Sequence, residues 1–327
     1  MNERELLDAV SKLPKSIEPP HDLWPAIETR LDRRRRAWVW VPLAAAAVLL
    51  VMLMSRGHPS TWDVTALAGR PLLGTERLVA TGRLRVGDWL QTDDSSRALI
   101  AVGRIGQVEV KPASRVQLVA AQATEHRLAL ARGMIAAKVD AMPRLFFVDT
   151  PAGTAIDLGC AYTLETDSLG NGLLHVTSGQ VEFASGSRSA RVLVGTLVHI
   201  RPLLGPGTPY VEDAPAPLVT ALVAFDFGDG RGSARATRTV LALARAQDAV
   251  SLWHLLQRVD VSLRGAVYDR LAALVAPPPG VTRRAAIALH PRDLEGYWSK
   301  IERIHFRTTV LRGVRDIDPR TGLAKPK

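Results

Sequence analysis

The amino-acid sequence predicts a multi-part membrane protein: a short α-helical cytosolic segment, one transmembrane helix, an antiparallel all-β domain and a small C-terminal α-helical bundle. Two observations lead to this class. Residues 37–54 form an apolar run without any charged or amide side chain. Further along, apolar residues recur at every second position within 78–201 and at helical spacing within 234–306, which are the patterns of strands and of helices.

Residues 1–36 carry two short amphipathic helical patterns that are separated by prolines. Pro14 ends the first pattern, and Asp22 is a suitable N-cap for the second. Helices this short bury little apolar surface against each other, so their apolar faces call for a partner. The alternative is that they lie on a membrane surface or stay partly disordered. The apolar positions are Leu6, Val10, Leu13, Leu23, Trp24, Ile27 and Leu31.

The apolar run 37–54 is long enough to cross a bilayer. As a helix, its roughly 18 residues would measure about 27 Å, close to the hydrocarbon thickness of about 30 Å. A signal peptide is one alternative, but its basic region and apolar core are usually shorter, and no clear A-x-A site follows the run. A buried helix of a soluble protein is the other alternative, but a basic flank with two tryptophans favours a membrane interface.

Basic residues lie mostly before this run, since only Arg56 is close on its other side. Because Lys and Arg that flank a span stay in the cytoplasm, residues 1–36 are expected inside and residues 55–327 outside. The chain is therefore predicted to be a single-pass protein of the lipid bilayer. The membrane-orienting residues are Arg33, Arg34, Arg35, Arg36, Trp38 and Trp40.

After a linker at 55–77, the region 78–201 predicts short strands separated by turns. Stretches such as 83–86 and 107–111 alternate polar and apolar residues, and turn signals such as Gly170-Asn171-Gly172 separate such stretches. Short strands with turns at regular spacing are typical of an antiparallel sandwich or a barrel-like roll.

Helical patterns return after a linker at 202–233 that is rich in proline and glycine. Within 234–306, Asp248 and Thr282 are suitable N-caps, and three prolines at 277–279 end a helix. The pattern predicts a small bundle of helical hairpins. A polar tail at 307–327 is expected to fray.

No arrangement of residues predicts catalysis or a metal site. The motifs of hydrolases and zinc proteases are absent from the sequence, and its eight histidines are dispersed. Asp226 and Asp229 do not match a calcium loop, and His254 is expected to be a partly exposed helix residue. Cys160, the only cysteine, is expected to be buried, with a redox or intermolecular role as the alternative. We therefore expect no enzyme activity and no cofactor.

The chain is basic, with a formal net charge of +10 and an isoelectric point of about 10.3. Half of this excess belongs to arginines just before the apolar run, and the remaining charges are scattered singly. A nucleic-acid-binding surface usually shows a basic stripe or patch, which this sequence lacks. Direct binding of nucleic acid is not expected.

The β region resembles the FecR-like domain found outside the membrane in transmembrane anti-sigma regulators. Short motifs of that family occur here in the family's order. One departure is that Gly159-Cys160-Ala161-Tyr162 stands where the family usually has Gly-Thr before an aromatic residue. The matching stretches are 87–92, 106–110, 114–118, 130–133, 147–153, 172–176 and 178–181.

The resemblance extends to residues 13–27, which look like the cytosolic anti-sigma segment that often precedes such spans. The zinc form of that module uses one His and two Cys, and this chain has no cysteine before Cys160, so the segment is expected to be metal-free. The apolar positions of 1–36 are then the expected contacts with an extracytoplasmic-function sigma factor.

The resemblance therefore implies a single-pass inner-membrane regulator with a cytoplasmic N-terminus and periplasmic C-terminal domains. It would transmit an envelope signal to its sigma factor and would meet an unknown periplasmic or outer-membrane protein. The alternative function is a membrane-anchored periplasmic scaffold or binding module without a sigma partner.

Overall fold

The computed structural model describes residues 61–230 and 232–315 of the 327-residue chain. The chain divides into two compact units, Met1–Pro59 and Ser60–Lys327, and the described residues all belong to the second. Every predicted sigma-binding and membrane-orienting residue lies outside the described residues, as does the predicted span 37–54.

Among the residues that the structure describes, no helix combines the length and the apolar character needed to cross a membrane. The longest of them, α8 (Pro291–Arg315), runs for 25 residues but carries charged side chains such as Glu295 and Lys300. This finding contradicts the transmembrane part of the predicted fold class and the predicted single-pass inner-membrane localisation, and we correct both. The described chain is largely β-sheet with a C-terminal helical region.

The strands form two sheets that share the long strand β9 (Glu125–Val139). All pairings are antiparallel except that of β9 with β10, which is parallel. The first sheet has the order β4 (Thr81–Leu84), β1 (Trp62–Ala68), β6 (Arg97–Val102), β7 (Gly106–Val110), β9, β12 (Ala161–Thr166), β13 (Gly172–Ser178) and β16 (Thr196–Arg201), and β16 also pairs with β17 (Gly205–Pro206) and β18 (Tyr210–Val211). The second has the order β3 (Glu76–Arg77), β2 (Leu72–Leu73), β5 (Trp89–Gln91), β8 (Arg115–Gln122), β9, β10 (Phe146–Thr150), β11 (Gly153–Asp157), β14 (Gln180–Ser185) and β15 (Arg188–Leu193).

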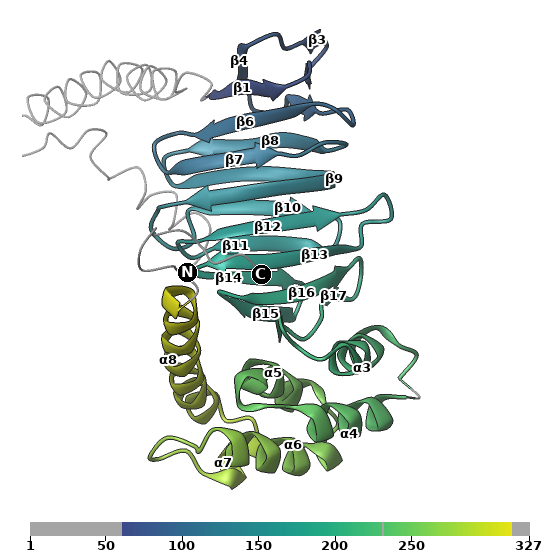
Figure 1. Ribbon diagram of the computed structural model, residues 1–327, viewed down its shortest axis with the longest axis vertical. Coiled ribbons are helices and arrows are strands. Elements are labelled where there is room, and N and C mark those ends of the chain that lie inside the picture. The colour runs from purple at the N-terminus through teal and green to yellow at the C-terminus, as the bar shows by residue number, and fades with distance from the viewer. Residues whose placement is uncertain (1–60, 231, 316–327) are drawn as a thin grey trace, which may run out of the picture. The chain divides into compact units, whose positions relative to one another are not determined.

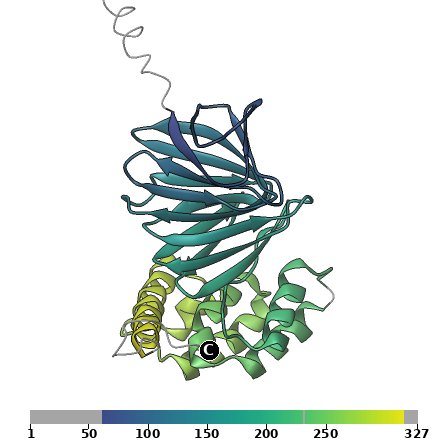
Figure 2. The ribbon, with the colours of Figure 1, turned by 45° about the horizontal axis from the view of Figure 1, so that its top comes forward.

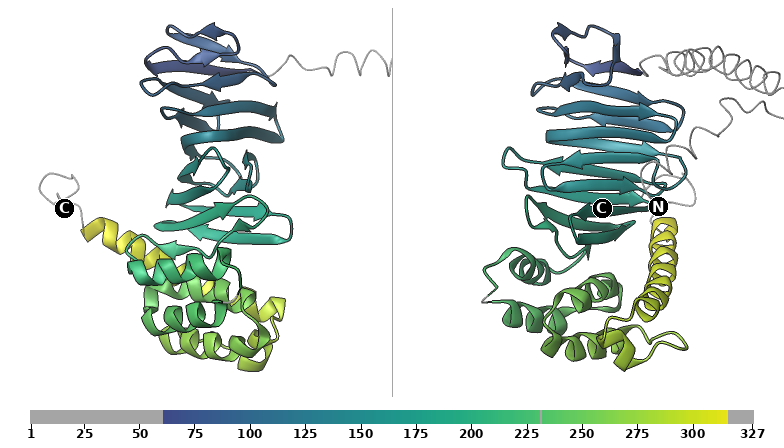
Figure 3. Two further views of the ribbon diagram at one scale, coloured as in Figure 1. Left: turned by 90° about the vertical axis from the view of Figure 1, so that its right-hand side faces the viewer. Right: turned by 180° about the vertical axis from the view of Figure 1, so that it is seen from behind.

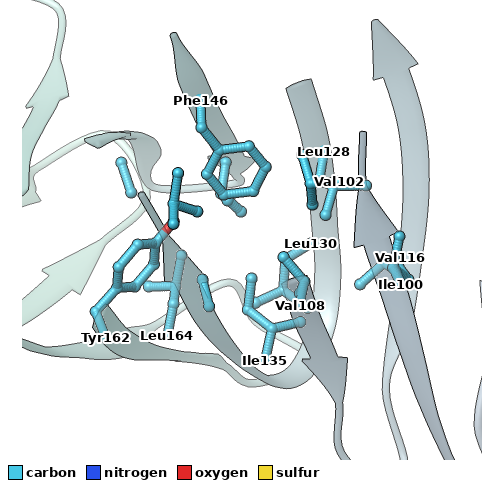
Figure 4. Packing of buried hydrophobic residues seen from close by; sticks show 14 of the residues in the cluster. Ile100, Val102, Val108, Val116, Leu128, Leu130, Ile135, Phe146, Tyr162 and Leu164 are labelled. Atoms are coloured by element: carbon cyan, nitrogen blue, oxygen red, sulfur yellow. The ribbon is translucent and has the colours of Figure 1, made fainter. Parts of the chain in front are cut away.

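The period-two alternation of the sequence places one face of each strand in a common core. In β6, for example, Ala98, Ile100 and Val102 are buried while the residues between them are not. Figure 4 shows Ile100, Val108 and Ile135 of one sheet near Val116, Leu128 and Leu130 of the other. Burial of each such side chain contributes about 1.5–3 kcal/mol, so this shared layer holds the two sheets together.

Gly133 lies where β9 passes from the second sheet to the first. Its φ of 90° favours glycine, and a Cβ built on it would lie 2.4 Å from the Cα of Ser114. The Ser114 hydroxyl accepts a hydrogen bond from the N–H of Met134 (2.9 Å), which ties β8 to this bend. The resemblance motif at 130–133 therefore ends on a glycine that the bend requires.

The helical region packs at one end of the β part (Figures 1, 2 and 3). Its apolar cluster includes Leu193 and Tyr210 from the last strands, so both parts belong to one compact unit. The helices before α8 are α3 (Ala216–Phe227), α4 (Ser233–Leu243), the 3-10 turn η1 (Ala246–Asp248), α5 (Ala249–Arg258), α6 (Val261–Leu274) and α7 (Arg283–Ile287).

The stretch 202–233, predicted as a linker, contains β17, β18 and helix α3. Proline does not prevent this helix, because Pro215 is its N-cap and Pro217 lies in its first turn, where no N–H is required. Leu218 and Leu222, one turn apart, are buried against the helical core. Burial of this apolar face in the tertiary structure therefore stabilises the helix.

The predicted caps differ in what they bind. Thr282 caps α7, accepting a hydrogen bond from the N–H of Ala285 (3.2 Å). Asp248 does stand at the N-cap of α5, but its carboxylate accepts hydrogen bonds from Arg245 instead of from the helix. Asp260, which the sequence analysis did not single out, caps α6.

Candidate functional site

The edge strand β15 meets the helices through side chains. An edge strand has unpaired backbone groups on one side, which is a site of unwanted pairing unless it is covered. Here the N–H of Arg191 donates to Nε2 of His254 (3.0 Å), and Arg258 donates to the carbonyl of Ser189 (2.9 Å). Just beyond the strand, His305 of α8 binds the carbonyl of Val194 (2.7 Å). Helices α5 and α8 thus cover this edge.

His254 is buried, with 3% of its surface exposed, whereas the sequence predicted a partly exposed residue. Its Nδ1 lies 2.8 Å from the carbonyl of Val250, so this nitrogen is the donor and Nε2 is the acceptor for Arg191. The ring is therefore neutral. Burial lowers the pKa of His254 to about 3, and the positive charges of Arg258 and Arg191 act in the same direction.

We expect His254 to make the fold acid-sensitive. The pKa of an unfolded histidine is near 6.5, and that of folded His254 is about 3. As pH falls below 6.5, the unfolded state therefore binds a proton that the folded state does not, and stability decreases until the pH approaches 3. Above pH 6.5 His254 is unprotonated in both the folded and the unfolded state, so it does not make the stability depend on pH.

The measurement is the free energy of unfolding of the wild type and of His254→Gln, whose amide oxygen can still accept the Arg191 N–H. Between about pH 6 and pH 4, the wild type should lose about 1 kcal/mol per pH unit more than the variant. The partly buried His126 and His199, whose pKa values are also lowered by desolvation, titrate in both proteins and cancel from the difference. His290→Gln, at an exposed position, is the matched control. Parallel pH curves for the wild type and His254→Gln would contradict the prediction.

Asp226, at the end of α3, joins three elements in a buried ion cluster. Its side chain is 2% exposed and contacts Arg188 of β15 at 2.5 Å and Arg258 of α5 at 3.2 Å. It also accepts a hydrogen bond from the N–H of Thr208 (2.6 Å). Burial lowers the pKa of Arg258 to about 10, an effect that Asp226 opposes. Asp226 belongs to the stretch 202–233, predicted as a linker, where no local signal indicates this burial.

Arg191 points from β15 toward α8 and the aromatic residues of the helical core. Its guanidinium makes a two-pronged contact with Glu295 at 3.0 and 2.9 Å. It also lies 5.6 Å from the ring of Trp253 and 5.4 Å from that of Trp298. Both rings lie within cation–π distance of the guanidinium, which favours a positive charge at this place.

These residues surround a cavity of about 630 Å³ beside β15, α3 and α5. Three arginines line it, against the single carboxylate of Asp226. His254 has no nitrogen left to activate a serine hydroxyl, because both ring nitrogens are hydrogen-bonded. The lining residues are Ser187, Arg188, Ser189, Arg191, Phe225, Asp226, Trp253, His254, Gln257 and Arg258.

A second buried polar cluster lies between β11 and β12. Cys160 is buried, as predicted, and its thiol donates to Oδ2 of Asp157 (2.7 Å). Burial raises the pKa of Cys160 and the neighbouring carboxylate raises it further, so the thiol is unreactive. In the described part of the chain, no group of three or more His, Cys, Asp or Glu residues is placed to hold a metal ion.

No protein-family model matches this chain, and no curated protein does. Among solved structures, two of a candidate anti-sigma factor from Parabacteroides distasonis are similar to it. The first is 15% identical, with a TM-score of 0.33, and the match covers 41% of this chain. The second is 14% identical, with a TM-score of 0.30, and the match covers 49% of this chain. In each case the match spans 64% of that chain, which is less than two thirds of its length.

Proposed function

We propose that this chain is a non-catalytic, FecR-like regulator that binds an extracytoplasmic-function sigma factor through residues 1–36. In this proposal the β and helical unit, residues 60–327, is a protein-binding module that receives the signal. The predicted membrane topology is not part of the proposal.

The observation that supports it is where the FecR-like motifs fall in the fold. Each motif lies on a strand or on the turn next to it, in order from β5 to β14. Three of the motif glycines, 133, 153 and 179, have positive φ. At each of them an added Cβ would lie within 2.4 Å of another residue. The motifs therefore follow one another along neighbouring strands of a single β arrangement, which supports the proposal.

A regulatory role is also in keeping with the chemistry of the cavity beside β15. Its histidine is neutral and fully hydrogen-bonded, and its one carboxylate is held by two arginines. Such groups are suited to binding, since none is free to transfer a proton.

We expect Trp24→Ala to weaken sigma-factor binding about thirtyfold, because a buried aromatic anchor contributes about 2 kcal/mol to an interface of this kind. Leu23→Asp together with Ile27→Asp should also weaken it, whereas substitution of the arginines at 33–36 should matter less. The measurement is a pull-down, followed by titration calorimetry, of the 327-residue chain with each sigma factor of the same genome.

Leu203→Ala is the matched control, since Leu203 is fully exposed at the turn between β16 and β17 and its truncation should leave binding unchanged. Failure of the wild type to bind any of these sigma factors would refute the proposal. Equal affinity of the wild type and Trp24→Ala would refute the assigned contact.

A further inference from the structure

We infer that the cavity beside β15, α3 and α5 binds a small organic anion, one with a single carboxylate or phosphate group on an apolar or aromatic body. This inference stands apart from the proposed sigma-factor contact, because every residue it uses lies in 187–258 and 295–302. It rests on the size of the cavity, on its charge and on two arginines whose hydrogen bonding is incomplete or replaceable.

The cavity has the dimensions and lining of a ligand site. Its volume of about 630 Å³ lies within the usual range of roughly 300–1,000 Å³ for small-molecule pockets. Phe225 and Trp253 provide apolar surface, and Ser187, Ser189 and Gln257 provide neutral hydrogen-bonding groups. An anionic group would therefore meet guanidinium groups, while the body of the ligand would meet aromatic rings.

Asp226 leaves one hydrogen-bond donor of Arg188 without a partner. Arg188 uses one terminal nitrogen to reach Asp226, and its buried Nε has no hydrogen-bond partner among the described residues. This Nε is closed to solvent, so a bound carboxylate or phosphate would meet the terminal nitrogens of Arg188, whose side chain is 30% exposed.

Arg191 has a partner that an incoming anion can replace. Glu295 is 56% exposed, so its contact with Arg191 contributes little and its carboxylate returns readily to water. The cation–π contacts with Trp253 and Trp298 do not depend on Glu295 and remain after that exchange. Glu302 is also close to Arg191, but burial raises its pKa, which reduces its competition for the arginine.

The test uses titration calorimetry of the 327-residue chain with benzoate, phenyl phosphate, inorganic phosphate and neutral benzyl alcohol. We expect saturable binding of benzoate or phenyl phosphate with a dissociation constant of about 1 mM or tighter, and none of benzyl alcohol. The preferred anion distinguishes a carboxylate ligand from a phosphate ligand, and inorganic phosphate alone tests the contribution of the aromatic body.

Arg191→Gln should weaken the binding about tenfold, because it removes a charge-assisted pair of hydrogen bonds. Arg188→Lys, which keeps the charge beside Asp226 but removes the planar guanidinium, should also weaken it. Arg283→Gln breaks an exposed pair with Asp269 on another face of the helices and is the matched control. Absence of saturable binding of all three anions up to about 10 mM would overturn the inference. The inference would also be overturned if a folded Arg191→Gln variant bound the same anion with the affinity of the wild type.

Discussion

Asp226→Asn is expected to lower the free energy of unfolding by about 3 kcal/mol or more. The substitution removes the charge that balances Arg258, whose side chain is only 12% exposed. Loss of one partner from a buried ion pair typically costs about 3–5 kcal/mol, since the other charge remains buried and uncompensated. The N–H of Thr208 also loses a charged acceptor. Guanidinium unfolding followed by tryptophan fluorescence measures the change.

Asp269→Asn is the matched control for this prediction. Asp269 also pairs with an arginine, Arg283, at 2.7 Å, but both side chains are 57% exposed. An exposed pair contributes about 0–1 kcal/mol, so this variant should remain close to the wild type. If the two variants lost equal stability, the Asp226 cluster would not hold the helices to β15 as we describe.

Gly133→Ala is expected to destabilise the protein by about 3 kcal/mol. A left-handed φ costs a residue with a Cβ about 1–2 kcal/mol, and Gly133 has a φ of 90°. The new methyl group would also lie 2.4 Å from the Cα of Ser114, which is backbone and cannot move aside without displacing β8. Overpacking of this kind adds about 1–3 kcal/mol.

Gly87→Ala separates these two effects. Gly87 has a φ of 95°, but nothing lies within 4 Å of the position that a Cβ would occupy. Its substitution should therefore cost only the conformational term of about 1 kcal/mol. The same denaturant measurement gives both values, and an equal loss in the two variants would show that β9 is not held tightly against β8 at its bend.

Local signals were sufficient for much of the β region. Alternation at 107–111 corresponds to β7, and Gly179 stands at a turn that needs positive φ. Gly133 also has positive φ, but it lies at a bend inside the continuous strand β9 and not at a turn between strands. The Thr282 cap was also readable, because its hydrogen bond spans only three residues. Such features depend on neighbours in the sequence, which is why a sequence pattern reports them.

The transmembrane expectation rested on hydropathy and flanking charge at 30–56. Among the described residues, no helix has the length and apolar character that it required. Helix α3 shows the limit of a local signal: its prolines suggested a connector, but Pro215 and Pro217 stand at the start of a helix whose apolar face is buried.

The sequence by itself determined the strand periodicity, the glycine-dependent bends, most of the helical segments of the C-terminal region and the burial of Cys160. Only the tertiary structure decided which charges are buried and what surrounds the cavity. Arg188 and Asp226 are 38 residues apart, His254 and Arg191 are 63 apart, and Arg191 and Glu295 are 104 apart. Each of these groups gains its pairing and its burial from the docking of the helices on β15. No local pattern encodes those contacts, because they depend on distances that only the folded chain sets.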